Sequence, residues 1–405
     1  MIEYQALAPD LKICRVLTGL WQIADLERDG QALDPVATAK FMTPYVEAGF
    51  TTFDMADHYG SAELIAGQFR RHEPGGDRVQ LLTKWVPEPG PVTLAATREA
   101  VQRSLDRLQL ERLDLLQYHA WNYADPAWLD SLFYLQELKS DGLIGHLGVT
   151  NFDAAHLRVA LASGIDIVSN QISYSLIDQR GAGDMTAVCE AYGVQLLAFG
   201  TVAGGFLSEK WLGRPEPADD ELATWSHMKY KRFIDAAGGW QRFQALLAVL
   251  DRIACKHGVT IPAVSSRYML NRPAVAGIIL GARLGQSEHL AENLATFELQ
   301  LDGDDEAAIT EAARTLQAIP GGCGDEYRTP PFLTASGDLS DHLDAVPAVF
   351  TPVTDDSQRQ RVFSNTVWEE MAGFCRALRR GERILVSGTT ATHGERHIGG
   401  ADPAA

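Results

Sequence analysis

Four side chains of complementary acid–base type follow strand-like segments in the first third of the chain. Asp54 and Tyr59 lie in FTTFDMADHYG, Lys84 lies in LLTKW and His119 ends LLQYH. A tyrosine hydroxyl, with an ordinary pKa of about 10, is a weak acid at neutral pH. A nearby ammonium group favours the tyrosinate, and a carboxylate keeps that ammonium charged. A histidine ring can donate a hydrogen bond to a carbonyl oxygen. Each side chain alone has an ordinary structural explanation, but together they predict a metal-free site that protonates a carbonyl oxygen while the carbon receives a hydride.

The elements that must position these residues alternate regularly along the chain. Short apolar, β-branched runs predict strands at 17–22, 51–56, 79–85, 113–119, 144–151, 167–172, 194–200 and 276–282. Helical periodicity covers 35–48, 61–71, 92–108, 126–141, 152–163, 183–192, 242–257 and 288–298, with a further helix at 260–270. Eight strand–helix units predict an α/β fold, the (β/α)8 TIM barrel, whose active site lies at the carboxyl ends of the strands. No G-x-G-x-x-G follows a strand, so an open dinucleotide-binding sheet is not favoured.

Domain boundaries follow from breaks in this alternation. We predict a barrel over 1–318, a linker or irregular stretch over 319–360 and a separate segment over 361–405. Residues 201–241 form a long connection after the seventh strand, where a functional flap would sit. Ser61 and Asp153 precede helical runs and are expected to cap them.

Composition narrows the class of protein. The net charge of −18 argues against a nucleic-acid partner, whose phosphates would be repelled. No stretch approaches the roughly 18–20 apolar residues that a membrane span requires, and the N-terminus does not resemble a signal peptide. The five cysteines include no C-x-x-C pair, which suggests neither a disulfide framework nor a zinc site. These features predict a cytoplasmic enzyme with reduced thiols, a small-molecule partner and no membrane contact, and they leave the oligomeric state open.

The segment FTTFDMADHYGSAELIAGQF, with LLTKW and LLQYH after it, resembles the aldo-keto reductases over about residues 1–315. The resemblance implies that Tyr59 is the general acid/base, that Lys84 and Asp54 tune it and that His119 orients the substrate. It also implies an NAD(P)H-dependent oxidoreductase that reduces an aldehyde, ketone or sugar-like carbonyl to an alcohol, or runs the reverse reaction.

The same resemblance implies a cofactor site. Thr150, Asn151 and Gln171 would hold the nicotinamide carboxamide, and Phe199 would stack on the ring where most relatives have tyrosine. The loop GTVAGGFLSEK, with Gly204 and Gly205, would close over the pyrophosphate. The basic Arg283 favours NADP(H), while Leu284 leaves NAD(H) open. The expected cofactor-binding residues are Trp21, Thr150, Asn151, Gln171, Phe199, Gly200, Thr201, Val202, Gly205, Leu207, Gly281, Arg283, Ser287, His289, Glu292 and Asn293.

Aromatic residues beyond the strand ends are candidates for a substrate pocket. We expect Trp85, Trp121 and Tyr123 to wall it, and Trp121 and Tyr123 are the stronger candidates because they lie in a loop after His119. Core packing explains Trp85 and Trp21 equally well.

The last segment differs from the barrel. Residues 361–405 predict strand, turn and strand, and VSGTT after a glycine turn resembles the first β-hairpin of the Rid (YjgF-type) enamine/imine deaminase fold. We interpret it as a partial Rid-type α+β domain, either a truncated appendage or the boundary of a longer fusion, without deaminase activity of its own. Two alternatives to a reductase stay open: a nicotinamide-binding regulatory subunit with little turnover, and a fusion with a functional Rid-type deaminase.

Overall fold

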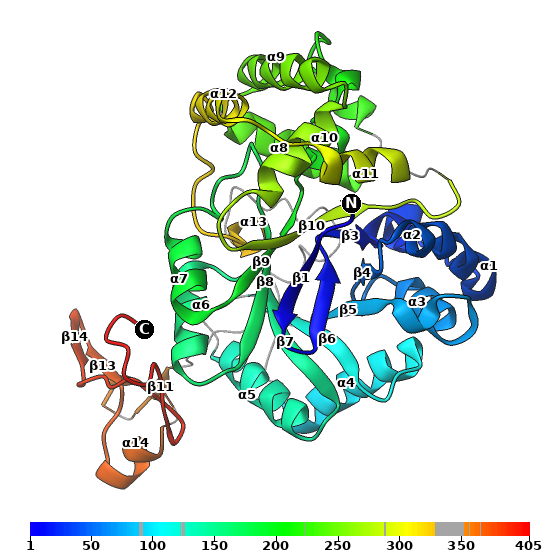
Figure 1. Ribbon diagram of the computed structural model, residues 1–405. Helices are drawn as coiled ribbons and strands as arrows, with labels where there is room; N and C mark the ends of the chain where they lie inside the picture. The colour runs from blue at the N-terminus through cyan, green and yellow to red at the C-terminus, as the bar shows by residue number, and fades with distance from the viewer. Residues whose placement is uncertain are drawn as a thin grey trace.

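The computed structural model describes residues 1–88, 92–121, 123, 126–222, 224–286, 289–328, 352–355, 357–364 and 366–405. Its centre is a closed barrel of eight parallel strands in the order β10-β3-β4-β5-β6-β7-β8-β9 (Figure 1). The strands are β3 Val16–Gly19, β4 Thr52–Asp54, β5 Gln80–Trp85, β6 Leu113–His119, β7 Ile144–Thr150, β8 Ile167–Ser173, β9 Gln195–Phe199 and β10 Val275–Gly281. The predicted (β/α)8 barrel is therefore confirmed.

Helices surround the barrel close to their predicted places. They are α3 Ala62–His72, α4 Leu94–Leu108, α5 Ala127–Ser140, α6 Ala154–Ala162, α7 Asp184–Tyr192, α9 Trp240–His257, α10 Ile261–Leu270 and α11 Leu290–Glu298. The helix predicted over 35–48 is instead divided into α1 Pro35–Ala39, a 3-10 turn at Lys40–Met42 and α2 Thr43–Ala48. Pro44 accounts for the break because it has no N–H to continue the first helix. None of the described helices has the length and apolar composition of a membrane span.

The two predicted helix caps have different outcomes. Asp153 accepts a hydrogen bond from the His156 N–H at 2.8 Å and caps α6 as expected. Ser61 does not cap α3; its hydroxyl donates to Asp25 at 2.7 Å and accepts from the Leu33 N–H at 3.0 Å. Ser61 thus joins two loops. Its hydroxyl donates to the charged Asp25 carboxylate, and hydrogen bonds to a charged acceptor are stronger than those between neutral groups. The hydroxyl oxygen accepts from Leu33 and not from an N–H of α3.

An N-terminal β-hairpin that the sequence reading did not anticipate closes one end of the barrel. It consists of β1 Tyr4–Ala8 and β2 Leu11–Cys14 and crosses the barrel end in Figure 1. The Gln195 side chain, at the start of β9, donates to the Ala6 carbonyl at 2.8 Å. Leu7 and Leu11 pack with Leu197 in a small cluster inside the barrel. Because the hairpin covers the amino ends of the strands, their carboxyl ends are left for the site.

Two segments that interrupt the predicted strand–helix alternation, the long connection 201–241 and the start of the predicted linker, fold back onto that carboxyl face. Within 201–241 lies α8 Trp225–Ala236, besides 3-10 turns at Ala203–Gly205, Glu209–Trp211 and Asp219–Glu221. Residues 319–328 follow α12 Gly303–Arg314 and end in the short helix α13 Asp325–Arg328. The Arg180 guanidinium holds this second segment through the Gly322 carbonyl at 2.8 Å and the buried Glu326 carboxylate at 2.9 Å. Residues 319–328 are therefore part of the packed barrel and not a linker.

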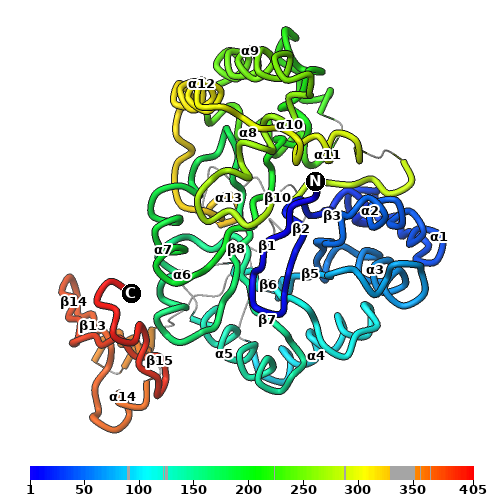
Figure 2. The backbone as a smooth tube through the Cα atoms, viewed as in Figure 1, coloured from blue at the N-terminus to red at the C-terminus, as the bar shows by residue number. Residues whose placement is uncertain are grey.

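The chain after residue 351 forms a separate small sheet (Figure 2). Strands β11 Val353–Thr354, β12 Gln360–Val362, β13 Ala377–Arg380 and β14 Arg383–Val386 are antiparallel in this order. Helix α14 Val367–Ala372 separates β12 from β13. The prediction of strand, turn and strand for this segment did not include this helix. After the last hairpin, β15 Thr392–His393 and β16 Arg396–His397, Asp402 binds the Arg158 guanidinium at 2.6 Å and 2.8 Å. The resemblance of this sheet to a Rid-type domain stays a prediction.

Candidate active site

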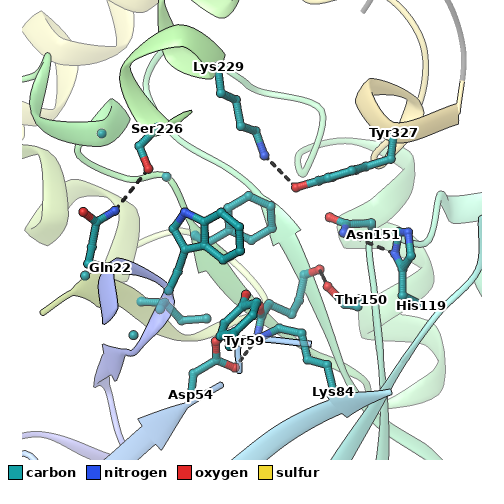
Figure 3. A pocket seen from close by; sticks show the side chains of 18 of the residues that line it. Gln22, Asp54, Tyr59, Lys84, His119, Thr150, Asn151, Ser226, Lys229 and Tyr327 are labelled. Atoms are coloured by element: carbon teal, nitrogen blue, oxygen red, sulfur yellow. Dashed lines mark hydrogen bonds and ion pairs between the residues drawn. The ribbon is translucent and has the colours of Figure 1, made fainter. Parts of the chain in front are cut away.

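A buried ion pair lies at the carboxyl ends of β4 and β5. The Lys84 ammonium is 2.6 Å from one Asp54 carboxylate oxygen and donates to the Met55 carbonyl at 2.8 Å (Figure 3). The other Asp54 oxygen accepts from the Gln171 side chain at 2.7 Å and from Gln117 at 3.2 Å. Burial lowers the pKa of Lys84, and the Asp54 charge opposes this by favouring the ammonium. The pair therefore holds a positive charge in a place where an isolated lysine would lose its proton more readily.

Tyr59 lies directly beside this charge. The Lys84 ammonium is 5.2 Å from the centre of the Tyr59 ring, which also meets the Trp21 indole edge-on at 5.0 Å. Tyr59 is positioned by the turn after β4, where its N–H donates to the Ala56 carbonyl at 3.1 Å. The tyrosine ring is thus fixed between a strand-borne ammonium and an aromatic wall.

His119 completes the group from the end of β6. Its side chain is buried, and Nδ1 lies 3.4 Å from the side-chain nitrogen of Asn151. Its ring meets Trp121 edge-on at 4.4 Å and Tyr327 at 5.5 Å. All four predicted catalytic residues, Asp54, Tyr59, Lys84 and His119, line one cavity, and we call them its floor.

Most of the predicted cofactor residues line this cavity or a neighbouring one. Those in the first cavity, besides the floor, are Trp21, Thr150, Asn151, Gln171, Phe199, Gly200, Val202, Gly204 and Gly281. Those in the second cavity are Val202, Gly204, Gly205, Gly281, Arg283, His289, Glu292 and Asn293. The two cavities share Val202, Gly204 and Gly281, so together they form the extended site that a dinucleotide needs.

Local backbone and polar groups fit a nicotinamide carboxamide. Asn151 has a left-handed φ of 59°, and its side-chain oxygen is buried without a hydrogen-bond partner in the described part of the chain. An unpartnered buried oxygen is costly unless a ligand donates to it, as the amide of a nicotinamide can. Gly204 has a φ of 62°, and a Cβ there would lie 2.8 Å from the Tyr230 ring. The glycine loop therefore approaches α8 more closely than a larger residue would allow.

Some predicted site residues lie elsewhere. Trp85 and Tyr123 line neither of the two cavities. The centre of the Trp85 ring is 5.6 Å from that of Tyr118, and the Tyr123 ring stacks on His156 with the ring centres 3.6 Å apart. Trp121 does line the first cavity. Thr201 and Leu207 are fully buried behind the glycine loop, and Ser287 lies outside the described residues. Trp85 and Tyr123 follow strand ends as predicted, but their rings fill apolar space between the barrel and its helices.

The sequence reading missed two residues on the opposite side of the first cavity. Lys229 comes from α8 and Tyr327 from α13, and the Lys229 ammonium donates to the Tyr327 hydroxyl at 2.6 Å. We call α8 and residues 319–328 the rim of the cavity. One signal was available for α8, because Tyr230, Phe233 and Ile234 have helical spacing. No local signal marks Tyr327.

Two further side chains bridge the mouth between the cavities. The Gln22 amide, after β3, donates to the Ser226 hydroxyl of α8 at 3.1 Å, and Arg283 donates to the Gln22 carbonyl oxygen at 3.2 Å. Trp21 donates to Glu27 at 2.5 Å beside them, and burial raises the pKa of that carboxyl. Within the described residues, no group of three or more His, Cys, Asp or Glu side chains is arranged to hold a metal ion.

Comparisons with known proteins agree with this geometry. The aldo/keto reductase family profile matches residues 15–314, well over half of the chain. Flagellar radial spoke protein 5 of Chlamydomonas reinhardtii is 29% identical over 257 residues, which span 53% of this chain and about half (49%) of that protein. An uncharacterized oxidoreductase of Mycobacterium tuberculosis is 27% identical over 77% of this chain and 93% of its own length. The structure of a glycerol dehydrogenase from Gluconobacter oxydans matches with a TM-score of 0.65 and 21% identity, covering 79% of this chain and 97% of that one, which supports the fold alone.

Proposed function

Because the chain belongs to the aldo-keto reductase family, we propose that it is an NADP(H)-dependent reductase of aldehydes, ketones or sugar-like carbonyls with Tyr59 as its general acid/base. The observation that carries the proposal is the placement of the Lys84 ammonium, 2.6 Å from Asp54 and 5.2 Å from the Tyr59 ring centre, in the cavity that His119 also lines.

The floor supplies the proton chemistry. In reduction, Tyr59 gives its hydroxyl proton to the carbonyl oxygen, and the Lys84 charge stabilises the tyrosinate that remains. Asp54 keeps Lys84 protonated, and the Gln171 and Gln117 amides hold the second Asp54 oxygen in place. His119 donates a hydrogen bond that orients the carbonyl oxygen toward Tyr59. In oxidation the same residues act in reverse, with tyrosinate as the base.

The cofactor residues fit a dinucleotide that spans both cavities. A hydride for the carbonyl carbon is the chemistry that a bound nicotinamide supplies. Asn151 and Thr150 would bind its carboxamide and Phe199 its ring face, while the backbone around Gly204 and Gly205 would face the pyrophosphate. Gln171 already donates to Asp54, so its carbonyl oxygen is the atom that would face the carboxamide.

The preference for NADP(H) rests on charge in the second cavity. Arg283 and Lys210 both line it, and the two carboxylates among its described residues are engaged: Glu292 pairs with His289 at 2.9 Å, and Glu209 accepts from the Ile261 N–H at 2.5 Å. In a protein of net charge −18, an additional phosphate needs such a local concentration of positive charge. We expect Arg283→Ala to weaken NADPH binding about 10- to 100-fold while NADH binding stays unchanged, since one charged hydrogen bond contributes about 1.5–3 kcal/mol.

The decisive experiment measures oxidation of NADPH and NADH by the wild-type protein with a panel of aldehydes, ketones and sugars. Turnover that prefers NADPH supports the proposal. Tight cofactor binding without turnover of any carbonyl contradicts it and favours the regulatory alternative. A titration of Arg283→Ala with both cofactors, followed by fluorescence, decides between NADP(H) and NAD(H).

A further inference from the structure

Lys229 differs from the other buried lysines of the described chain. Lys84, Lys229 and Lys231 are each less than a tenth exposed. Lys84 is paired with Asp54 at 2.6 Å, and Lys231 is paired with both Asp235 and Glu216 at 2.7 Å. Lys229 has no carboxylate partner among the described residues. A buried ammonium without a counter-charge is costly, so this site calls for an anion that the described chain itself does not provide.

The surroundings of Lys229 hold the ammonium in one place. Its nitrogen donates to the Tyr327 hydroxyl at 2.6 Å and lies 4.8 Å from the centre of the Phe199 ring and 4.7 Å from that of Tyr327. Aromatic faces attract a cation but do not neutralise it. In Figure 3, the Lys229 side chain descends from the rim toward Tyr327, on the opposite side of the cavity from Asp54 and Lys84.

The position along the extended site indicates which ligand this ammonium faces. Lys229 lines the cavity that contains the floor, whereas Arg283 and Lys210 line the neighbouring one. Tyr327, which receives the Lys229 hydrogen bond, also meets the His119 ring at 5.5 Å. The ammonium is therefore one aromatic ring away from the residue that faces the carbonyl, at the substrate end of the site.

We propose, building on the reductase function above, that Lys229 binds a carboxylate of the substrate, which is therefore an aldehyde or ketone that also carries an acid group. One ammonium balances one carboxylate. A phosphate dianion would leave a second charge unbalanced in a protein of net charge −18. The strongly acidic protein repels anions in general, so a carboxylate needs a local positive charge to bind. Lys229 supplies that charge at the rim and thereby selects this substrate class.

The test compares two substrates that share one aldehyde. The ratio of kcat/KM for 4-carboxybenzaldehyde to that for its neutral methyl ester is measured with NADPH for wild type and Lys229→Met. We expect the ratio to fall about 10- to 100-fold in the variant, since it loses one charge-assisted hydrogen bond. Lys231→Met is the matched control: it removes a second buried lysine of the same helix, which is held by Asp235 and Glu216, and should leave the ratio unchanged. Lys229→Arg should preserve the preference for the acid.

Three results would overturn the inference. A ratio that is equal in wild type and Lys229→Met would show that Lys229 does not sense the carboxylate. Weaker NADPH binding by that variant, with both aldehydes affected alike, would assign Lys229 to the cofactor. A larger Lys229-dependent preference for glycolaldehyde phosphate over glycolaldehyde would replace the carboxylate by a phosphate.

Two further measurements keep the test decisive. If Lys229→Met does not fold, Tyr327→Phe removes only the hydroxyl that holds the ammonium; it should lower the ratio several-fold, and an unchanged ratio counts against the inference. Failure of wild type to reduce 4-carboxybenzaldehyde, its methyl ester and other neutral aldehydes alike would refute the reductase function itself. Reduction of the ester without any dependence of the ratio on Lys229 would refute only the carboxylate site.

Discussion

In the floor of the cavity the buried ammonium of Lys84 faces a carboxylate, whereas in the rim the buried ammonium of Lys229 faces aromatic rings and one hydroxyl. The floor is held by short strands of one closed sheet, and the rim is held by two segments that return to the barrel from elsewhere in the chain. Under the two proposals above, the paired charge of Lys84 would serve the reaction step common to all carbonyls, while the charge of Lys229, which has no carboxylate partner among the described residues, would be available for one class of substrate. Floor variants should therefore affect every substrate, and rim variants should affect binding.

The largest effect is expected for Tyr59→Phe. Removal of the proposed general acid should lower kcat about 10³-fold for every carbonyl, within the usual range for loss of general acid catalysis. NADPH binding, followed by fluorescence titration, should remain nearly unchanged because the ring is retained. A variant that keeps most of its kcat would show that Tyr59 is not the general acid/base.

Asp54→Asn should have the next largest effect. Burial already lowers the pKa of Lys84, and the Asp54 charge opposes that shift. Without this charge, the Lys84 pKa falls further, so the decline of kcat/KM on the alkaline side moves to lower pH, by about one pH unit or more. At neutral pH we expect about a 10²-fold loss of activity and about 3 kcal/mol less unfolding free energy, as for a broken buried ion pair.

The check on this prediction is a pair of pH–rate profiles. Wild type should lose activity as pH rises through the Lys84 pKa, which lies below the ordinary value of 10.5. If kcat/KM declined at the same alkaline pH in both proteins, Asp54 would not set the pKa of Lys84. That result would contradict the proposal that the floor residues act together as one charged group.

A smaller effect is expected in the rim for Arg328→Met. The guanidinium donates to the Ala120 carbonyl at 2.9 Å and to the Asn151 carbonyl at 2.7 Å, which ties α13 to the ends of β6 and β7. Methionine keeps much of the apolar stem but loses both bonds, so we expect KM to rise about tenfold with kcat nearly retained. A fall in kcat with constant KM would instead place Arg328 among the residues that support the reaction step.

The smallest effect is expected far from both regions, for Asp402→Ala. Asp402 accepts from Arg158 and from Tyr192 at 2.6 Å, and those bonds join the C-terminal sheet to α6 and α7. Hydrogen exchange of residues 389–405 should become faster, while kcat/KM should not change. A loss of activity would show that the C-terminal sheet acts on the barrel.

The floor could be predicted from the sequence because each of its residues follows or ends a short apolar strand. Once Asp54, Lys84 and His119 are placed at the carboxyl ends of consecutive parallel strands, the closed barrel brings them together without further information. The rim could not be predicted in this way. Its placement depends on contacts between distant residues, such as the buried ion pair of Arg180 with Glu326, which no local pattern reveals.

Aromatic residues show the same limit on a smaller scale. Trp121 and Tyr123 follow the same strand and had equal claims on the pocket. Trp121 turns toward His119, and Tyr123 turns away to stack on His156. Spacing along a loop does not determine the direction of a side chain, because the neighbours that select its rotamer come from other elements.

The position of Tyr327 also has a consequence for how the protein is made. Synthesis proceeds from the N-terminus, and domains fold as their residues emerge. All eight barrel strands precede Tyr327 in the chain, so a growing polypeptide contains the complete floor well before the ring that stands against His119 has been translated. The end of the cavity that Tyr327 lines is therefore among the last parts of the barrel to be synthesised.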